Sequence, residues 1–207
     1  MMNIRGTSLA GTALLLVLAV SVAGCASKQV TRIDPNSVTD LSGRWNDTDS
    51  RLVANALIEQ SLGNAWASRY AAAHGGDAPT VIVGEFANRS HEHIPVGTFV
   101  RDLESAFINS GAVRVVASRE ERQEVRAERE DQQENARAET RARMAQELGA
   151  RYMMQGDIQT ITDREGRETV VYYQIDARLV DLESNEKVWT GQHRIKKYIE
   201  RSRLGWD

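Results

Sequence analysis

Apolar residues recur at every fourth position over residues 51–74, which is the spacing of one face of an α-helix. The polar run 47–50 offers N-cap groups and early negative charge, Gly63 interrupts the pattern, and Gly75-Gly76 ends it. The spacing therefore predicts a helix that Gly63 divides into two pieces. Its apolar stripe consists of Ala54, Ile58, Leu62, Trp66 and Tyr70.

Strand and helix patterns alternate in the next segment. Residues 80–87 are rich in β-branched side chains, which is typical of a buried strand, and residues 113–117 resemble a second, short strand. Between them, Pro95 suits the first turn of a helix and Gly111 suits its end. The expected core face of this helix consists of Val96, Phe99, Val100, Leu103, Ala106 and Phe107.

From residue 151 onward the apolar period changes from about four to two. Apolar and polar residues alternate along 152–160, 171–179 and 187–198, and turn residues separate these three segments. This pattern predicts consecutive antiparallel hairpins with one covered face. The expected fold class is therefore α/β: a single domain with a mixed sheet, helices interleaved in the first half and a C-terminal antiparallel meander.

The segment 119–143 is strongly charged and almost without apolar residues. It contains seven arginines and eight acidic residues, and Val125 is its only large apolar residue. Such a pattern favours a solvated helix or loop. Met144, Ala145 and Leu148 follow, so we expect the end of a helix there to dock on the domain.

Residues 1–24 have the features of a secretory signal peptide. Arg5 provides a positive start, and the apolar run 9–20 is shorter than a membrane span. The run ends in Val22-Ala23-Gly24-Cys25, which is similar to the lipobox of bacterial lipoproteins. We therefore expect acylation of Cys25, which would then be the first mature residue and would hold the protein at a membrane.

The residues after the cysteine predict the destination and the layout of the mature chain. Position 26 is Ala, not the Asp that retains enteric lipoproteins at the inner membrane, so we expect the periplasmic face of the outer membrane. Residues 25–46 are mainly polar and aperiodic, which predicts a lipidated tether. We assign residues 47–200 to the globular domain and 201–207 to a tail.

Composition and motifs argue against several functions. The chain has 26 Lys and Arg against 29 Asp and Glu, so it lacks the basic excess of a nucleic-acid binder. Its single cysteine permits no intramolecular disulfide and no cysteine-based zinc cluster. The sequence contains neither a phosphate-binding glycine loop nor a Gly-x-Ser-x-Gly nucleophile motif. We therefore expect a binding protein, not an enzyme, and no cofactor.

Two features resemble functional sites, but each has a simpler interpretation. His91-Glu92-His93 has two potential metal ligands, but nothing in the sequence fixes a third and fourth, so we interpret it as a polar surface loop and expect no metal. Glu85 and Asp157 lie within apolar strands, where an outward-facing or paired carboxylate is more common than a functional one.

Four stretches, in order, resemble the LpoB-like lipoproteins, which activate penicillin-binding proteins. They are residues 40–53, 85–90, 149–156 and 181–189. The resemblance implies a domain similar to the N-terminal domain of TolB. It also implies a non-enzymatic outer-membrane lipoprotein that reaches a bifunctional penicillin-binding protein and stimulates glycan polymerisation and crosslinking. The chain departs from the family in having Arg151 in place of the usual Asp and in lacking a long Pro-rich tether.

The charged segment is the candidate contact surface for that partner. We expect Arg122, Arg126, Arg129 and Arg137 to contribute electrostatic contacts. Two other functions stay open: an envelope assembly or secretion lipoprotein related to TolB or curli-assembly components, and an envelope hydrolase. The sequence does not predict the oligomeric state.

Overall fold

The computed structural model describes residues 29–135 and 149–201, and its main compact unit begins at Val38. Cys25, Arg137, Met144, Ala145, Leu148 and residues 202–207 lie outside the described residues, so the predictions made for them stay predictions. The helices are α2 (Asp47–Leu62), α3 (Trp66–Ala73), α4 (Val96–Ser110) and α5 (Arg119–Asn135). The strands are β1 (Thr80–Asn88), β2 (Arg114–Val115), β3 (Tyr152–Glu165), β4 (Glu168–Asp181) and β5 (Lys187–Glu200).

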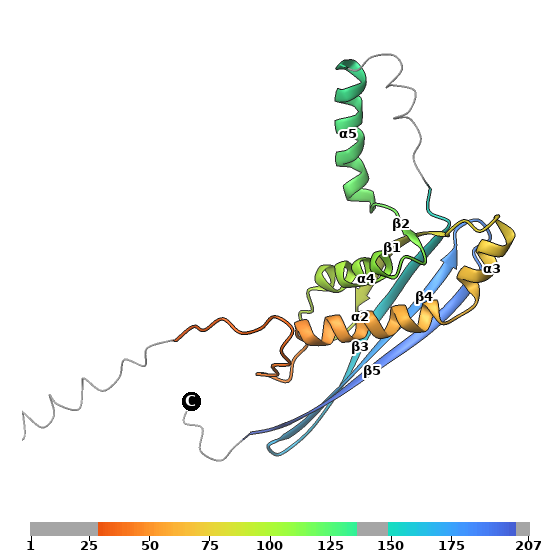
Figure 1. The fold of residues 1–207 in the computed structure, drawn as a ribbon. Helices are drawn as coiled ribbons and strands as arrows, with labels where there is room; N and C mark the ends of the chain where they lie inside the picture. The colour runs from red at the N-terminus through yellow and green to blue at the C-terminus, as the bar shows by residue number, and fades with distance from the viewer. Residues whose placement is uncertain (1–28, 136–148, 202–207) are drawn as a thin grey trace, which may run out of the picture. The chain divides into compact units, whose positions relative to one another are not determined.

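The strands form one mixed sheet in the order β2-β1-β3-β4-β5. Strand β1 pairs in parallel with β2 and β3, whereas β3, β4 and β5 form an antiparallel meander. Helices α2 and α4 lie side by side across one face of this sheet (Figure 1). The predicted fold class, an α/β domain with a mixed sheet and a C-terminal meander, is confirmed.

The core lies between the two helices and the sheet. Along β4 every second residue is buried, because one face of the strand packs against α2 and α4 while the other is half-exposed. Gly156 of β3 allows close packing there, since a Cβ would collide with the carbonyl oxygen of Asp176 and the ring of Phe86. The largest fully buried side chains include Tyr173, Phe99, Phe107, Leu57 and Leu103.

The helix ends follow from local hydrogen bonds. Asn46, not a residue of the run 47–50, is the N-cap of α2, and it forms a capping box with Asp49. Gly63 is the C-cap of α2, so the predicted interruption of the first helix is confirmed. The short strand expected over 113–117 has only two paired residues, Arg114 and Val115.

The two segments with the weakest patterns have definite structure where they are described. The first part of the charged segment is helical as α5, through Asn135. Residues 38–46, which the sequence placed in the tether, belong to the compact unit. The unit therefore begins earlier than the expected boundary at residue 47, because Asp40 and Trp45 contact the domain.

Candidate functional site

A partly buried ion-pair cluster, in which Asp49 is buried and Asp40 is exposed, fastens the start of the compact unit to β5. The ammonium of Lys197 lies 2.8 Å from Asp40 Oδ1 and 2.6 Å from Asp49 Oδ2, and it donates to the carbonyl oxygen of Arg44 at 3.1 Å. The side chains of Lys197 and Asp49 are 11% and 8% exposed. Burial alone lowers the pKa of Lys197, but the hydrogen bonds to the two carboxylates outweigh burial and raise it.

A second buried contact joins the loop after β1 to the same segment. The Tyr173 hydroxyl lies 2.9 Å from both carboxylate oxygens of Glu92, and one of those oxygens accepts from the backbone N–H of Trp45 at 3.3 Å. Burial raises the pKa of Tyr173, and the hydrogen bond to Glu92 raises it further, so the hydroxyl stays protonated and donates. The Trp45 ring packs edge-on against Tyr173 and Phe99.

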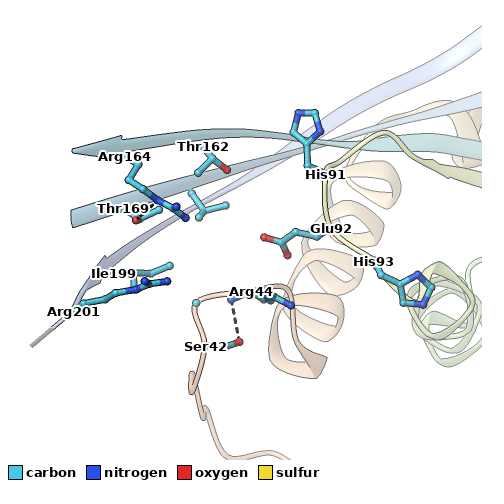
Figure 2. Close-up of a pocket in the computed structure, with 12 residues that line it drawn as sticks. Ser42, Arg44, His91, Glu92, His93, Thr162, Arg164, Thr169, Ile199 and Arg201 are labelled. Carbon is cyan, nitrogen blue, oxygen red and sulfur yellow. Dashed lines mark hydrogen bonds between the residues drawn. The ribbon is translucent and has the colours of Figure 1, made fainter. Parts of the chain in front are cut away.

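A cavity of about 380 Å³ opens beside these contacts (Figure 2). Four segments that are distant in the sequence form its wall: residues 42–44, the loop 91–93, the adjoining ends of β3 and β4, and the chain around Ile199 and Arg201. The lining is mainly cationic and hydroxylated. Its polar side chains are Ser42, Arg44, His91, Glu92, His93, Thr162, Arg164, Thr169 and Arg201.

The arginines expected to contact a partner lie on α5. Arg122, Arg126 and Arg129 are spaced by four and three residues, so they share one helix face with Val125. Arg122 is half-buried and donates to the carbonyl oxygen of Ala117 at 3.1 Å, whereas Arg126 is exposed. The structure therefore brings three of the four predicted arginines onto one surface, and Arg122 also anchors the start of that helix.

The start of α5 meets α4 in a shallow apolar hollow. Val125 and Ile108, which are 44% and 59% exposed, line it together with Val115. Burial raises the pKa of Glu104 in this hollow, and the nearby Glu121 carboxylate raises it further.

The two strand carboxylates do not form a site with one another. Glu85 is exposed on β1. Asp157 lies on the sheet face that the helices leave uncovered, where it accepts from Gln159 at 2.7 Å and lies 3.9 Å from Arg178. Both match the outward-facing interpretation of the sequence.

The described part of the chain shows neither a metal-binding cluster nor a membrane-spanning helix. Residues 29–135 and 149–201 contain no group of three or more His, Cys, Asp or Glu side chains that could hold a metal ion. Within the same ranges, no helix combines the length and apolar character needed to span a bilayer.

Comparison with known proteins decides the family. The model of the family described as the peptidoglycan-synthase activator LpoB matches residues 49–195, well over half of the chain. The chain belongs to the LpoB family. The matched range runs from the capping box of α2 into β5, so it covers the sheet, its helical layer and α5.

Solved structures of LpoB domains are similar to this chain, although their sequences are distant. The C-terminal domain of LpoB from Escherichia coli is 15% identical with a TM-score of 0.43, covering 72% of this chain and 99% of that one. The Salmonella enterica domain has the same identity and coverages and a TM-score of 0.41. Lipoprotein GNA1162 from Neisseria meningitidis is 18% identical with a TM-score of 0.37, covering 61% and 88%. No curated protein matches the chain significantly.

The sequence did not predict the Lys197 cluster or the cavity. One signal was present. Lys197 lies an even number of residues after Trp189 and Ile195 on β5, so its side chain points to the same face of the sheet as theirs, which is the face toward the core. A lysine at such a position needs a buried partner. The partners, Asp40 and Asp49, lie more than a hundred residues away, and no periodic pattern relates them.

Proposed function

We propose that the protein is a lipid-anchored regulator at the periplasmic face of the outer membrane. In this proposal it binds a bifunctional penicillin-binding protein and increases peptidoglycan synthesis without catalysing a reaction itself. The observation that carries the proposal is the family match over residues 49–195. The lipobox-like sequence ending at Cys25 supports the anchored part of the proposal.

Activation would arise from differential binding. A protein that contacts a synthase more favourably in its active conformation shifts the synthase toward that conformation, and the shift cannot exceed the difference in affinity. The α5 face with the exposed Arg126 and the half-buried Arg129, next to the apolar hollow at Val125, supports a contact that combines electrostatic steering with a small apolar centre.

The direct test combines the purified full chain with a bifunctional penicillin-binding protein and lipid-linked peptidoglycan precursor. We expect faster glycan polymerisation and crosslinking with both proteins than with the synthase alone, and no turnover by the regulator alone. Unchanged synthase rates would contradict the proposal, and so would turnover of glycan strands by the regulator without the synthase. Recovery of a large ring in detergent, without synthase binding, would favour the assembly alternative.

A separate set of variants tests whether the α5 arginines form the contact surface for the synthase. Reversing Arg122, Arg126, Arg129 and Arg137 to Glu should weaken synthase binding by about tenfold or more and reduce its salt dependence. The matched control reverses four exposed basic residues outside α5. Equal affinities of the two variants would reject this surface but leave the activator role standing. The control residues are Arg69, Arg114, Arg194 and Lys196.

A further inference from the structure

The cavity beside the Lys197 cluster is a pocket with three arginines and one glutamate in its lining. Arg164 reaches it from β3, Arg201 from the residue after β5, and Arg44 from the segment before α2. None of these three guanidinium groups forms an ion pair with another described residue. All three side chains are exposed, so solvent screens their repulsion, but an anion placed between Arg164 and Arg201 would be attracted by both.

The one acidic side chain in the wall does not neutralise them. Glu92 lines the cavity, and its carboxylate accepts hydrogen bonds from the Tyr173 hydroxyl and the Trp45 backbone N–H, which hold it in place. Figure 2 shows the guanidinium groups of Arg164 and Arg201 on the opposite side of the cavity from Glu92. An anion that contacts both arginines would therefore sit away from the Glu92 carboxylate.

The remaining polar groups add hydrogen-bond donors. Thr169 Oγ1 accepts from Arg164 Nε at 3.3 Å, which leaves the terminal nitrogens of Arg164 available to a ligand. Thr162 and Ser42 also line the cavity, and the Ser42 hydroxyl oxygen accepts from the Arg44 backbone N–H at 3.4 Å, so its own hydrogen can still be donated. Guanidinium groups donate pairs of hydrogen bonds to phosphate oxygens, and hydroxyl groups can donate to the oxygens that remain.

We propose that this pocket binds a phosphate group carried on a small organic moiety. Its volume of about 380 Å³ lies in the range of small-ligand sites, so it has room for a phosphate and the group attached to it. Arg164 and Arg201 bind the phosphate oxygens, and the hydroxyls of Thr162 and Ser42 complete the shell. This site is separate from α5 and does not depend on the proposed activator role.

Two sources offer the same chemistry: a lipid headgroup and a free phosphate compound. The pocket is lined by residues 42–44, near the start of the compact unit, where the chain arrives from the proposed anchor at Cys25. That placement is the reason to include a headgroup among the probes.

The test is an NMR titration of the full chain in non-ionic detergent and phosphate-free buffer, observing the arginine Nε–Hε signals. The probes are inorganic phosphate and monomeric dihexanoyl phosphatidylglycerol. We expect saturable shifts of the Arg164 and Arg201 signals, with half-saturation at about 1 mM or below for at least one probe. Tenfold tighter binding of phosphatidylglycerol identifies a headgroup site, and similar affinities identify a site for free phosphate compounds.

Paired variants keep the test specific. R164Q/R201Q should weaken probe binding by about tenfold or more. R69Q/R114Q removes the same charge from exposed residues outside the pocket and should bind the probes like the wild type. Unchanged amide spectra outside the pocket establish that the variants fold. Absence of saturation with either probe at about 20 mM, or equal weakening by both variants, would overturn the proposal.

Discussion

At the scale of single residues, Lys197 carries the contact between the start of the compact unit and the sheet. Its ammonium is nearly buried, and it satisfies Asp49, whose other role is in the capping box of α2. Loss of the lysine leaves the 8%-exposed Asp49 side chain without its cation. An unpaired buried charge costs more free energy than the intact pair contributes, because water can no longer solvate it.

We therefore expect Lys197→Met to lower the free energy of unfolding by about 2–4 kcal/mol, measured by urea denaturation. The matched control is Lys196→Met, which removes the same charge from an exposed position next to it and should cost less than about 0.5 kcal/mol. A loss below about 1 kcal/mol for Lys197→Met would mean that the cluster contributes little to stability.

The same cluster has a defined pH window. The hydrogen bond from Lys197 lowers the pKa of Asp40, so the stabilisation is present above the unfolded pKa of about 4 and is lost as pH falls through the folded value. The pKa of Lys197 is raised, so its stabilisation is present below the unfolded pKa of about 10.4 and is lost as pH rises through the folded value.

The stability difference between wild type and Lys197→Met should therefore be largest at about pH 6–9 and shrink at both extremes. The measurement is a series of urea denaturations of both proteins between about pH 3 and pH 11. A difference that stays constant across this range would show that methionine changes packing and that the charges contribute little.

At the scale of elements, the same capping motif occurs in two different settings. Asn46 and Asp49 form a capping box at α2, which packs on the sheet. Ser118 and Glu121 form one at α5: the Ser118 N–H donates to Glu121 at 2.7 Å, and the Glu121 N–H donates to Ser118 Oγ at 3.3 Å. Most side chains of α5 are exposed, so this helix depends on local interactions.

Loss of each cap should therefore be detected by a different measurement. Asn46→Ala should lower the global free energy of unfolding by about 1–2 kcal/mol, whereas Ser118→Ala should leave it within about 0.5 kcal/mol of wild type. Hydrogen exchange of the first turn of α5 should accelerate about fivefold in Ser118→Ala. A global loss of about 1 kcal/mol in Ser118→Ala would show that α5 unfolds together with the core.

The elements also show how far the sequence predicts this structure. Residues with a strong period, such as Val171 to Leu179, predicted the meander because alternation follows directly from strand geometry. Segment 38–46 has no period, and its place in the unit depends on pairings such as Asp40 with Lys197. Long-range polar contacts of this kind, including Tyr173 with Glu92, leave no local pattern, so the cavity they border could not be predicted.

One departure from the family pattern has a local structural explanation. Arg151, where the family usually has Asp, donates to Asp181 Oδ2 from Nε at 3.0 Å and from Nη2 at 2.7 Å, and it also pairs with Glu183. Its backbone N–H donates to Thr80, next to the start of β3. The arginine therefore joins the β4–β5 turn to the edge where β1 and β3 begin, which a carboxylate facing Asp181 would not do.

At the scale of the whole molecule, the number of residues between the proposed anchor and the domain limits where the domain can act. In the proposed anchored state, the chain between Cys25 and Asp40 extends at most about 50 Å, because each residue spans about 3.5 Å. This tether is shorter than the one expected over residues 25–46, since Asp40 and Trp45 are fastened to the domain. A synthase partner must therefore present its contact surface within the combined reach of this short tether and the domain.

Anchoring and activation are then separable properties of the same chain. Cys25→Ala should move the protein out of the outer-membrane fraction in cells, because no acyl group can be attached, and it should abolish activation there. The same purified variant should stimulate the synthase in solution within about twofold of wild type, since the proposed contact surface lies on α5.

Ser27→Ala is the matched control and should behave as wild type in both assays. Retention of Cys25→Ala in the membrane fraction would locate the anchor elsewhere, whereas loss of stimulation in solution would make the acylated terminus part of the contact with the synthase.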